Sequence, residues 1–178
     1  MKSQFEVNIL TDDLSIEQVN TIEEHLYDLS ALLVRTVEDG ASIGFLSPIE
    51  IIDANNYWKT VLGPEVILLV AKSNNKIVGS IQLHLCSKQN GNHRAEIVKL
   101  MTLPNFRRKG IGRLLMQKAE EIAKHDGRSL LVLDTREGDP SNYLYTSLEY
   151  VRAGRIPNYA KSTNGELAAT IFYYKEIN

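Results

Sequence analysis

The sequence predicts a single α/β domain, in which helices flank a mixed, mostly antiparallel sheet of about seven strands. Three observations predict this class. Consecutive β-rich runs with short polar turns occupy the middle of the chain, a strongly apolar run follows an amphipathic helix, and two further β-rich runs come last. The 178 residues suit one compact domain, and neither an internal repeat nor a linker divides them. We therefore expect residues 1–178 to form one domain.

A strand and two helices are predicted first. Residues 5–10 alternate weakly between polar and apolar side chains, which favours a strand, whereas residues 15–36 have apolar side chains at helical spacing. A glycine-bearing loop over 38–45 follows, and Pro48 then suits the first turn of a second helix. The apolar positions of the first helix are Ile16, Val19, Ile22, Leu26, Leu29 and Leu33.

Three strands are predicted next, over residues 65–72, 76–86 and 95–103, with Asn- and Gly-containing turns between them. The apolar period then becomes that of a helix over about 111–126, and the apolar run 129–135 follows. Strand, helix and strand in this order predict a right-handed parallel crossover. The sheet is therefore expected to be mixed.

The last predicted elements are a short helix over 143–148 and strands over 149–156 and 168–177. Asp139 and Ser141 are each suited to capping the helix. The apolar segment "ATIFYY" in the final strand is compatible with a homodimer interface.

Composition narrows the range of partners. The net charge of −2 gives no overall reason to expect nucleic acid or an anionic membrane. Cys86 is the only cysteine, which excludes an intramolecular disulfide and favours a reducing compartment. No apolar run reaches membrane-spanning length, and the first ten residues lack a signal-peptide core. We expect a cytoplasmic protein without a metal, because no ligand spacing is shared by His25, His84, His93 and His125.

The segment "RRKGIG" at residues 107–112, between a strand and a helix, has the chemistry of a phosphate-binding turn. A helix N-terminus offers unpaired N–H groups and a partial positive charge, and Gly110 and Gly112 have no Cβ to keep an anion from the backbone. The segment is neither a Walker A loop nor a dinucleotide fingerprint. The alternative is a glycine-containing turn without function. Local positive charge comes from Arg107, Arg108 and Lys109.

Residues 96–150 resemble the coenzyme A binding core of the GNAT acetyltransferases. The family motif Arg/Gln-x-x-Gly-x-Gly/Ala matches Arg107, Gly110 and Gly112, and the order of strand, turn, helix and strand agrees. A second family signature, Leu-Tyr-x-x-x-Gly-Phe, is similar to "LYTSLEY", in which Tyr145 stands at the tyrosine position.

Two departures from the family pattern stand in this segment. Glu149 replaces the usual glycine, and Asn142 lies three residues before Tyr145, whereas the family's asparagine lies seven before it. Over most of its length the chain also resembles the tabtoxin-resistance branch of the family, through "GASIGF", "LVLDTREGD" and "NGELAATIFYYK".

This resemblance implies acetyl-coenzyme A as the cosubstrate. Backbone amides of the 107–112 turn would bind its pyrophosphate, and the backbone of 100–103 would pair with pantetheine like an added strand. The strands 95–103 and 129–135 would splay apart where pantetheine and acceptor meet. The expected cofactor-binding residues are Leu100, Met101, Thr102, Leu103, Arg107, Arg108, Lys109, Gly110, Ile111, Gly112, Arg113, Asn142 and Tyr145.

Three residues are candidates for catalysis. The resemblance implies that Tyr145 protonates the departing thiolate, and a phenol, with a pKa of about 10, holds its proton at neutral pH. Glu96 and Asp134 lie where the splay is expected, and we nominate both as base or amine ligands. The alternatives are aromatic packing for Tyr145, a solvated strand end for Glu96 and a loop cap for Asp134.

The expected reaction is acetyl transfer to the primary amine of a small molecule, amino-acid-like or antibiotic- or toxin-like, by direct attack in a ternary complex. The alternatives are acetylation of a protein or peptide N-terminus and a non-catalytic coenzyme A binding regulatory module. Acceptor specificity is expected in the loop 38–47, Trp58 and the segment 155–167, while Arg152 and Arg155 would suit an acceptor carboxylate.

Overall fold

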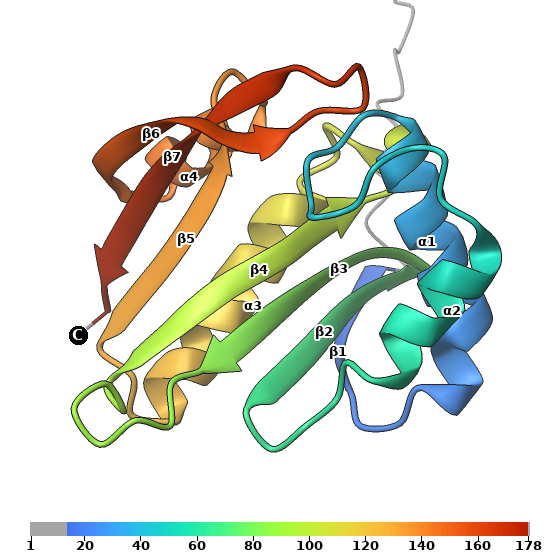
Figure 1. Ribbon diagram of the computed structural model, residues 1–178. Coiled ribbons are helices and arrows are strands. Elements are labelled where there is room, and N and C mark those ends of the chain that lie inside the picture. The colour runs from blue at the N-terminus through green and yellow to red at the C-terminus, as the bar shows by residue number, and fades with distance from the viewer. Residues whose placement is uncertain (1–13, 178) are drawn as a thin grey trace, which may run out of the picture.

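One sheet of seven strands, in the order β1-β2-β3-β4-β5-β7-β6, organises the chain in the computed structural model, which describes residues 14–177 (Figure 1). The predicted α/β class, with a mixed sheet and flanking helices, is confirmed. The strands are β1 Leu14–Val19, β2 Val66–Ser73, β3 Lys76–Leu85, β4 Arg94–Thr102, β5 Leu130–Arg136, β6 Val151–Lys161 and β7 Leu167–Glu176. The helices are α1 Leu26–Glu38, α2 Ile51–Lys59, α3 Ile111–His125 and α4 Ser141–Ser147, with short 3-10 turns η1 Glu23–His25 and η2 Pro104–Phe106.

The strands β4 and β5 form the single parallel pair of the described sheet, as the crossover through α3 requires. Their register joins residues 94–96 only to residues 130–132, while β4 continues along β3 as far as Thr102. The two strands therefore separate beyond Glu96 and Val132, and this separation creates the opening in which the site lies.

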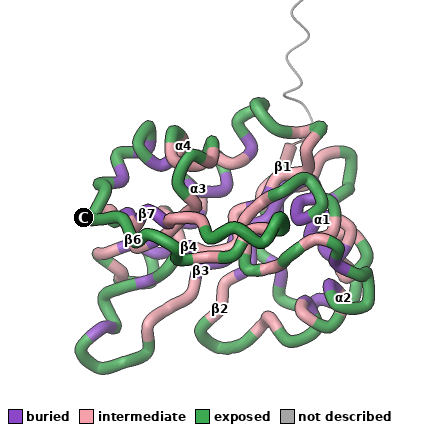
Figure 2. The backbone as a smooth tube through the Cα atoms, turned by 45° about the horizontal axis from the view of Figure 1, so that its top comes forward, coloured by how far each residue is buried: buried purple, intermediate pink, exposed green. Residues whose placement is uncertain are grey.

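Helices cover both faces of the sheet, and each face has its own core. Along β2, alternate residues face opposite sides: Leu69 and Ala71 pack in the core that includes α3, whereas Leu68 and Val70 pack under α1 and α2. Buried residues follow α1 and the central strands in Figure 2, whereas β6 at the sheet edge is exposed along nearly all its length. None of the helices within residues 14–177 is long and apolar enough to cross a membrane.

The predicted helix over 15–36 is wrong in its first part. Residues 14–19 form the edge strand β1, and the helix α1 begins only at Leu26. Leu14 and Ile16, two residues apart, pack against the same core, as strand residues do. The apolar residues from Ile16 onward also repeat at helical spacing, so the sequence favoured a helix over this alternation. The strand predicted over residues 5–10 lies outside the described residues.

Two helix starts also differ from prediction. The helix α2 begins at Ile51 after Glu50, so Pro48 lies before the helix and not in its first turn. The helix α4 begins at Ser141 after Pro140, and no side chain caps it, so the predicted caps from Asp139 and Ser141 are wrong. In place of a cap, Asp139 forms an ion pair with Arg136 at 2.8 Å.

Candidate active site

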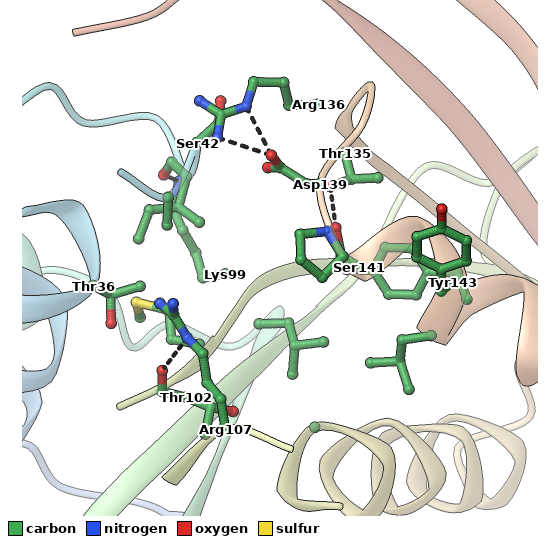
Figure 3. A pocket seen from close by; sticks show the side chains of 18 of the residues that line it. Thr36, Ser42, Lys99, Thr102, Arg107, Thr135, Arg136, Asp139, Ser141 and Tyr143 are labelled. Carbon is green, nitrogen blue, oxygen red and sulfur yellow. Dashed lines mark hydrogen bonds and ion pairs between the residues drawn. The ribbon is translucent and has the colours of Figure 1, made fainter. Parts of the chain in front are cut away.

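A cavity of about 850 Å³ lies at the separation of β4 and β5 (Figure 3). Its lining includes the loop after α1, the end of β4, the turn before α3, and parts of β5, α4 and the β6–β7 hairpin. Tyr145, which packs on the α3 side of the sheet, and Asp134, which points to the other side, both line it. The cavity therefore passes through the sheet.

The turn before α3 presents backbone N–H groups to this cavity. The helix begins at Ile111, and no side chain caps its first N–H groups. Arg108 and Gly110 adopt left-handed conformations, with φ of 62° and 81°. At Gly112, a Cβ would lie 3.3 Å from Cδ2 of Leu144, so glycine allows α3 and α4 to approach closely. This uncapped, glycine-lined helix start fits an anionic phosphate group.

Two of the basic side chains at the turn, Arg107 and Lys109, already have partners in the protein. Arg107 forms an ion pair with Asp39, at the end of α1, and donates from Nε to the carbonyl oxygen of Thr102 at 3.3 Å. Lys109 lies over the ring of Phe106, 4.9 Å from its centroid. Arg107 thus ties the turn to the loop after α1, while Lys109 is not part of the cavity lining.

Most of the predicted cofactor-binding residues are brought together around the cavity. Leu103, Lys109 and Asn142 are not part of its lining. The residues that do line it are Leu100, Met101, Thr102, Arg107, Arg108, Gly110, Ile111, Gly112, Arg113 and Tyr145.

Asn142 instead holds the start of α4 in place. Its Nδ2 donates to the carbonyl oxygens of Arg136 and Asp139, at 2.9 and 2.8 Å, and its Oδ1 accepts from the hydroxyl of Tyr173 at 2.9 Å. These bonds use both N–H donors of the amide and one of the two acceptor positions of its oxygen, all within the protein.

Tyr145 is buried among aromatic rings. Its ring lies 6.0 Å from that of Tyr150 and 5.8 Å from that of Tyr173, between ring centroids. Burial, with a smaller contribution from the charge of Asp134, raises the pKa of Tyr145 far above its ordinary value. The phenol therefore keeps its proton at neutral pH and is available as a hydrogen-bond donor.

Glu96 and Asp134 project from the opposite face of the sheet to Tyr145. Oδ2 of Asp134 accepts a hydrogen bond from Oγ1 of Thr170 at 3.0 Å. Glu96 lines a second, adjoining cavity of about 480 Å³, over the part of β4 and β5 that is paired. Burial and the charge of Asp134 raise the pKa of Glu96. The two carboxylates thus lie near each other but line different cavities.

Lys99 is a site residue that the sequence did not indicate. It adopts a left-handed conformation in β4, with φ of 55°, and its Nζ donates to the carbonyl oxygen of Ile43 at 2.5 Å and lies 5.4 Å from the ring centroid of Phe45. Burial lowers the pKa of Lys99. This lysine holds the loop after α1 against the cavity. A charged residue between the apolar Val98 and Leu100 is the one signal that could have identified it.

A polar chain through His84 was also missed, because His84 looked like one of several scattered histidines. The ring Nε2 of His84 lies 2.9 Å from Oε1 of Gln82, and Nε2 of Gln82 donates to the hydroxyl of Tyr57 at 2.7 Å. His84 lies directly opposite Glu96 in the β3–β4 register. Only the register, which the sequence does not display, brings these groups together.

Arg152 and Arg155, suggested as ligands for an acceptor carboxylate, are both occupied by Glu137. Arg155 makes two bonds of 2.8 Å to its carboxylate, and Arg152 lies 4.0 Å away. All three side chains are exposed. Within residues 14–177, no three His, Cys, Asp or Glu side chains are grouped so that they could hold a metal ion.

Known proteins resemble this chain in sequence over most of its length. The family model for the Acetyltransferase (GNAT) family matches residues 37–150. An uncharacterized N-acetyltransferase of the hisH-hisA intergenic region in Azospirillum brasilense is 33% identical over 129 residues, which cover 70% of this chain and 77% of that protein.

Solved structures share the fold at lower identity. An N-acetyltransferase from Staphylococcus aureus Mu50 superposes with a TM-score of 0.81 at 17% identity, over 94% of this chain and 100% of that one. The yncA protein of Salmonella typhimurium, solved with its cofactor acetyl-CoA, superposes with a TM-score of 0.78 at 15% identity, over 94% and 95% of the two chains.

Proposed function

We propose that this chain, which belongs to the GNAT acetyltransferase family and is an acetyl-coenzyme A dependent N-acetyltransferase, acetylates the primary amine of a small molecule, amino-acid-like or antibiotic- or toxin-like. The amine attacks directly, in a complex that holds both substrates. The observation that carries this proposal is the cavity through the sheet, with Tyr145 on one side and the carboxylate of Asp134 on the other.

The residues present fit acetyl-coenzyme A. The N–H groups at the start of α3, with Arg107, Arg108 and Arg113 nearby, would hold its phosphates. The edge of β4 beyond Glu96, which no longer pairs with β5, leaves backbone groups for the pantetheine amides. When bound, acetyl-coenzyme A supplies a thioester as the acetyl donor.

The catalytic groups divide between the two faces of the sheet. Tyr145, buried and protonated, would give a proton to the departing thiolate on the α3 side. Glu96 and Asp134 on the other face would bind the acceptor amine or act as base. An amine that approaches from one face and a thiolate that leaves toward the other need no rearrangement between steps, which supports direct attack.

Contacts above the acceptor side favour a small acceptor over a peptide. Lys99 holds Ile43, and Arg136 donates to the carbonyl oxygen of Gly40 at 2.9 Å, so the loop after α1 is tied to both β4 and β5. The backbone N–H of Ser47 also donates to Oγ1 of Thr163 at 3.4 Å, which joins this loop to the tip of the β6–β7 hairpin (Figure 1). This bridge restricts the open groove that an extended peptide would need.

The test is thiol release from acetyl-coenzyme A across a panel of amino acids, β-lactam amines, polyamines and short peptides, with the variant Tyr145→Phe as control. We expect turnover on a small amine and a large loss of it in the variant. Turnover confined to peptides would overturn the small-molecule assignment. Coenzyme A binding without turnover on any amine would instead support a regulatory module.

A further inference from the structure

We propose that His84 is the catalytic residue that takes the proton from the acceptor amine, and that Gln82 and Tyr57 are positioning residues that hold its ring in the reactive tautomer. This inference rests on the proposed function and adds a residue to it. It divides the work at the acceptor side, with Glu96 and Asp134 holding the ammonium group and His84 accepting its proton.

The place of His84 follows from the sheet register. His84 of β3 and Glu96 of β4 are direct partners in an antiparallel pair, so their side chains project side by side from the same face. Both line the cavity of about 480 Å³, together with Val132 and Phe172. Glu96 and Val132 are the last pair before β4 and β5 separate. His84 therefore lies on the acceptor face of the sheet, in the cavity beside the point where the strands separate.

Hydrogen bonds select the tautomer of His84. Gln82 is almost fully buried, at 1% exposure, and its Nε2 donates to the hydroxyl of Tyr57 at 2.7 Å. This orientation leaves Oε1 of Gln82 facing Nε2 of His84, 2.9 Å away. Because a carbonyl oxygen can only accept, Nε2 of His84 must carry a hydrogen. In the neutral ring, Nδ1 then keeps its lone pair and can accept a proton.

Burial and a neighbouring cation keep the ring of His84 neutral, although a carboxylate faces it. Burial lowers the pKa of His84, and the positive charge of Lys99 in β4 adds to the effect. Glu96 of β4 lies opposite His84, and the hydroxyl of Tyr57 in α2 accepts a hydrogen bond from Gln82. The charge of Asp134 in β5 raises the pKa of Glu96 and acts in the same direction on Lys99. The neighbour of His84 in β2 is the apolar Val66. At neutral pH, His84 is thus an uncharged base beside carboxylates that attract a cation.

The proposed step balances in atoms and charge. One N–H bond of the acceptor ammonium breaks, its electron pair stays on the nitrogen, and the proton binds Nδ1 of His84. The ring becomes an imidazolium, and the amine becomes a neutral nucleophile. The imidazolium then returns its proton to solvent through the open cavity.

The tautomer can be tested without an acceptor or acetyl-coenzyme A. In ¹⁵N NMR spectra of the protein labelled at histidine, we expect His84 to carry its hydrogen on Nε2 at neutral pH and to titrate below the ordinary value of about 6.5. Replacing Gln82 by Met should remove this preference for a hydrogen on Nε2. A hydrogen on Nδ1, or a charged ring at pH 7, would overturn the proposal.

Chemical rescue tests the catalytic step, with the best acceptor from the amine panel. We expect His84→Ala to lower kcat about 100-fold, as loss of a general base does, and added imidazole to restore part of it at pH values where imidazole is neutral. Coenzyme A affinity should stay unchanged, and His125→Ala should behave as wild type. Unchanged kcat, or a loss that imidazole does not restore, would overturn the role of His84. Absence of wild-type turnover on every amine would overturn the proposed function instead, and the NMR test of His84 would still apply.

Discussion

Glu96 and Asp134 project from neighbouring strands on one face of the sheet, close enough for the charge of Asp134 to raise the pKa of Glu96. Burial acts in the same direction and is the larger cause. Two carboxylates that repel each other beside an opening are suited to binding a cation, and a protonated amine is such a cation. This relationship makes this face of the site, where we propose that the acceptor binds, acidic although Lys99 lies nearby.

Replacing Glu96 by Gln should separate function from stability. A carboxyl whose pKa is raised in the folded state adds stability below its unfolded pKa, and this stability is lost as the pH rises through the folded pKa. The Glu96→Gln variant should therefore have a higher Tm than wild type at pH 7, and this difference in Tm should vanish near pH 3.5. The KM of the amine should rise about tenfold or more in the variant. Thermal melts at both pH values and steady-state kinetics measure this. An unchanged KM with a lower Tm would contradict it.

The hydroxyl of Tyr145 can be removed while its ring stays packed. In Tyr145→Phe, the contacts with the rings of Tyr150 and Tyr173 remain, so the fold and coenzyme A affinity should persist while kcat falls about 10- to 100-fold. In Tyr145→Ala, the buried ring is lost, and the free energy of unfolding should drop by about 3 to 5 kcal/mol. Equal kcat in Tyr145→Phe and wild type would show that the tyrosine only packs.

Gly110 tests the phosphate-binding turn against a matched glycine. Gly110 and Gly127 stand before and after α3 with φ of 81° and 77°, and a Cβ at either would meet nothing within 4 Å. Alanine at either position should lower the free energy of unfolding by about 1 kcal/mol through backbone strain. Only Gly110→Ala should disturb the N–H groups at the helix start and raise the Kd of coenzyme A, by about tenfold. Calorimetric titration of both variants checks this, and equal Kd values would place the phosphates elsewhere.

Lys99 should control acceptor binding through the loop after α1. In Lys99→Met, the bond to the carbonyl oxygen of Ile43 and the contact with Phe45 are lost, while a chain of similar length stays in place. We expect the KM of the amine to rise several-fold and the Kd of coenzyme A to remain. The same change in both constants would mean that Lys99 supports the whole site and not the loop alone.

The sequence showed the glycine-containing turn before α3 far more clearly than the groups on the opposite face of the sheet. The turn before α3 is continuous in the chain, so Arg107, Gly110 and Gly112 could be identified from local chemistry alone. His84 and Glu96 are brought together by strand pairing, and Lys99 reaches Ile43 from 56 residues away, so neither arrangement has a local signal.

The error in the first helix has a similar cause. An edge strand of six residues, with only one buried, alternates too weakly to outweigh apolar residues that happen to repeat at helical spacing. The pairing of Leu14–Val19 with β2 decides the conformation, and this long-range contact is invisible in the periodicity. The strongly periodic α3, by contrast, was predicted to within a residue or two of its ends.

Steady-state kinetics test most directly whether the acetyl group passes straight from acetyl-coenzyme A to the amine. The initial rate of thiol release is measured while the concentrations of acetyl-coenzyme A and the best amine are both varied, and the product is identified by mass spectrometry. Direct attack in a ternary complex predicts intersecting lines in double-reciprocal plots and an acceptor carrying one acetyl group. Parallel lines, with acetyl groups trapped on the protein when the amine is omitted, would show a covalent intermediate and contradict the account.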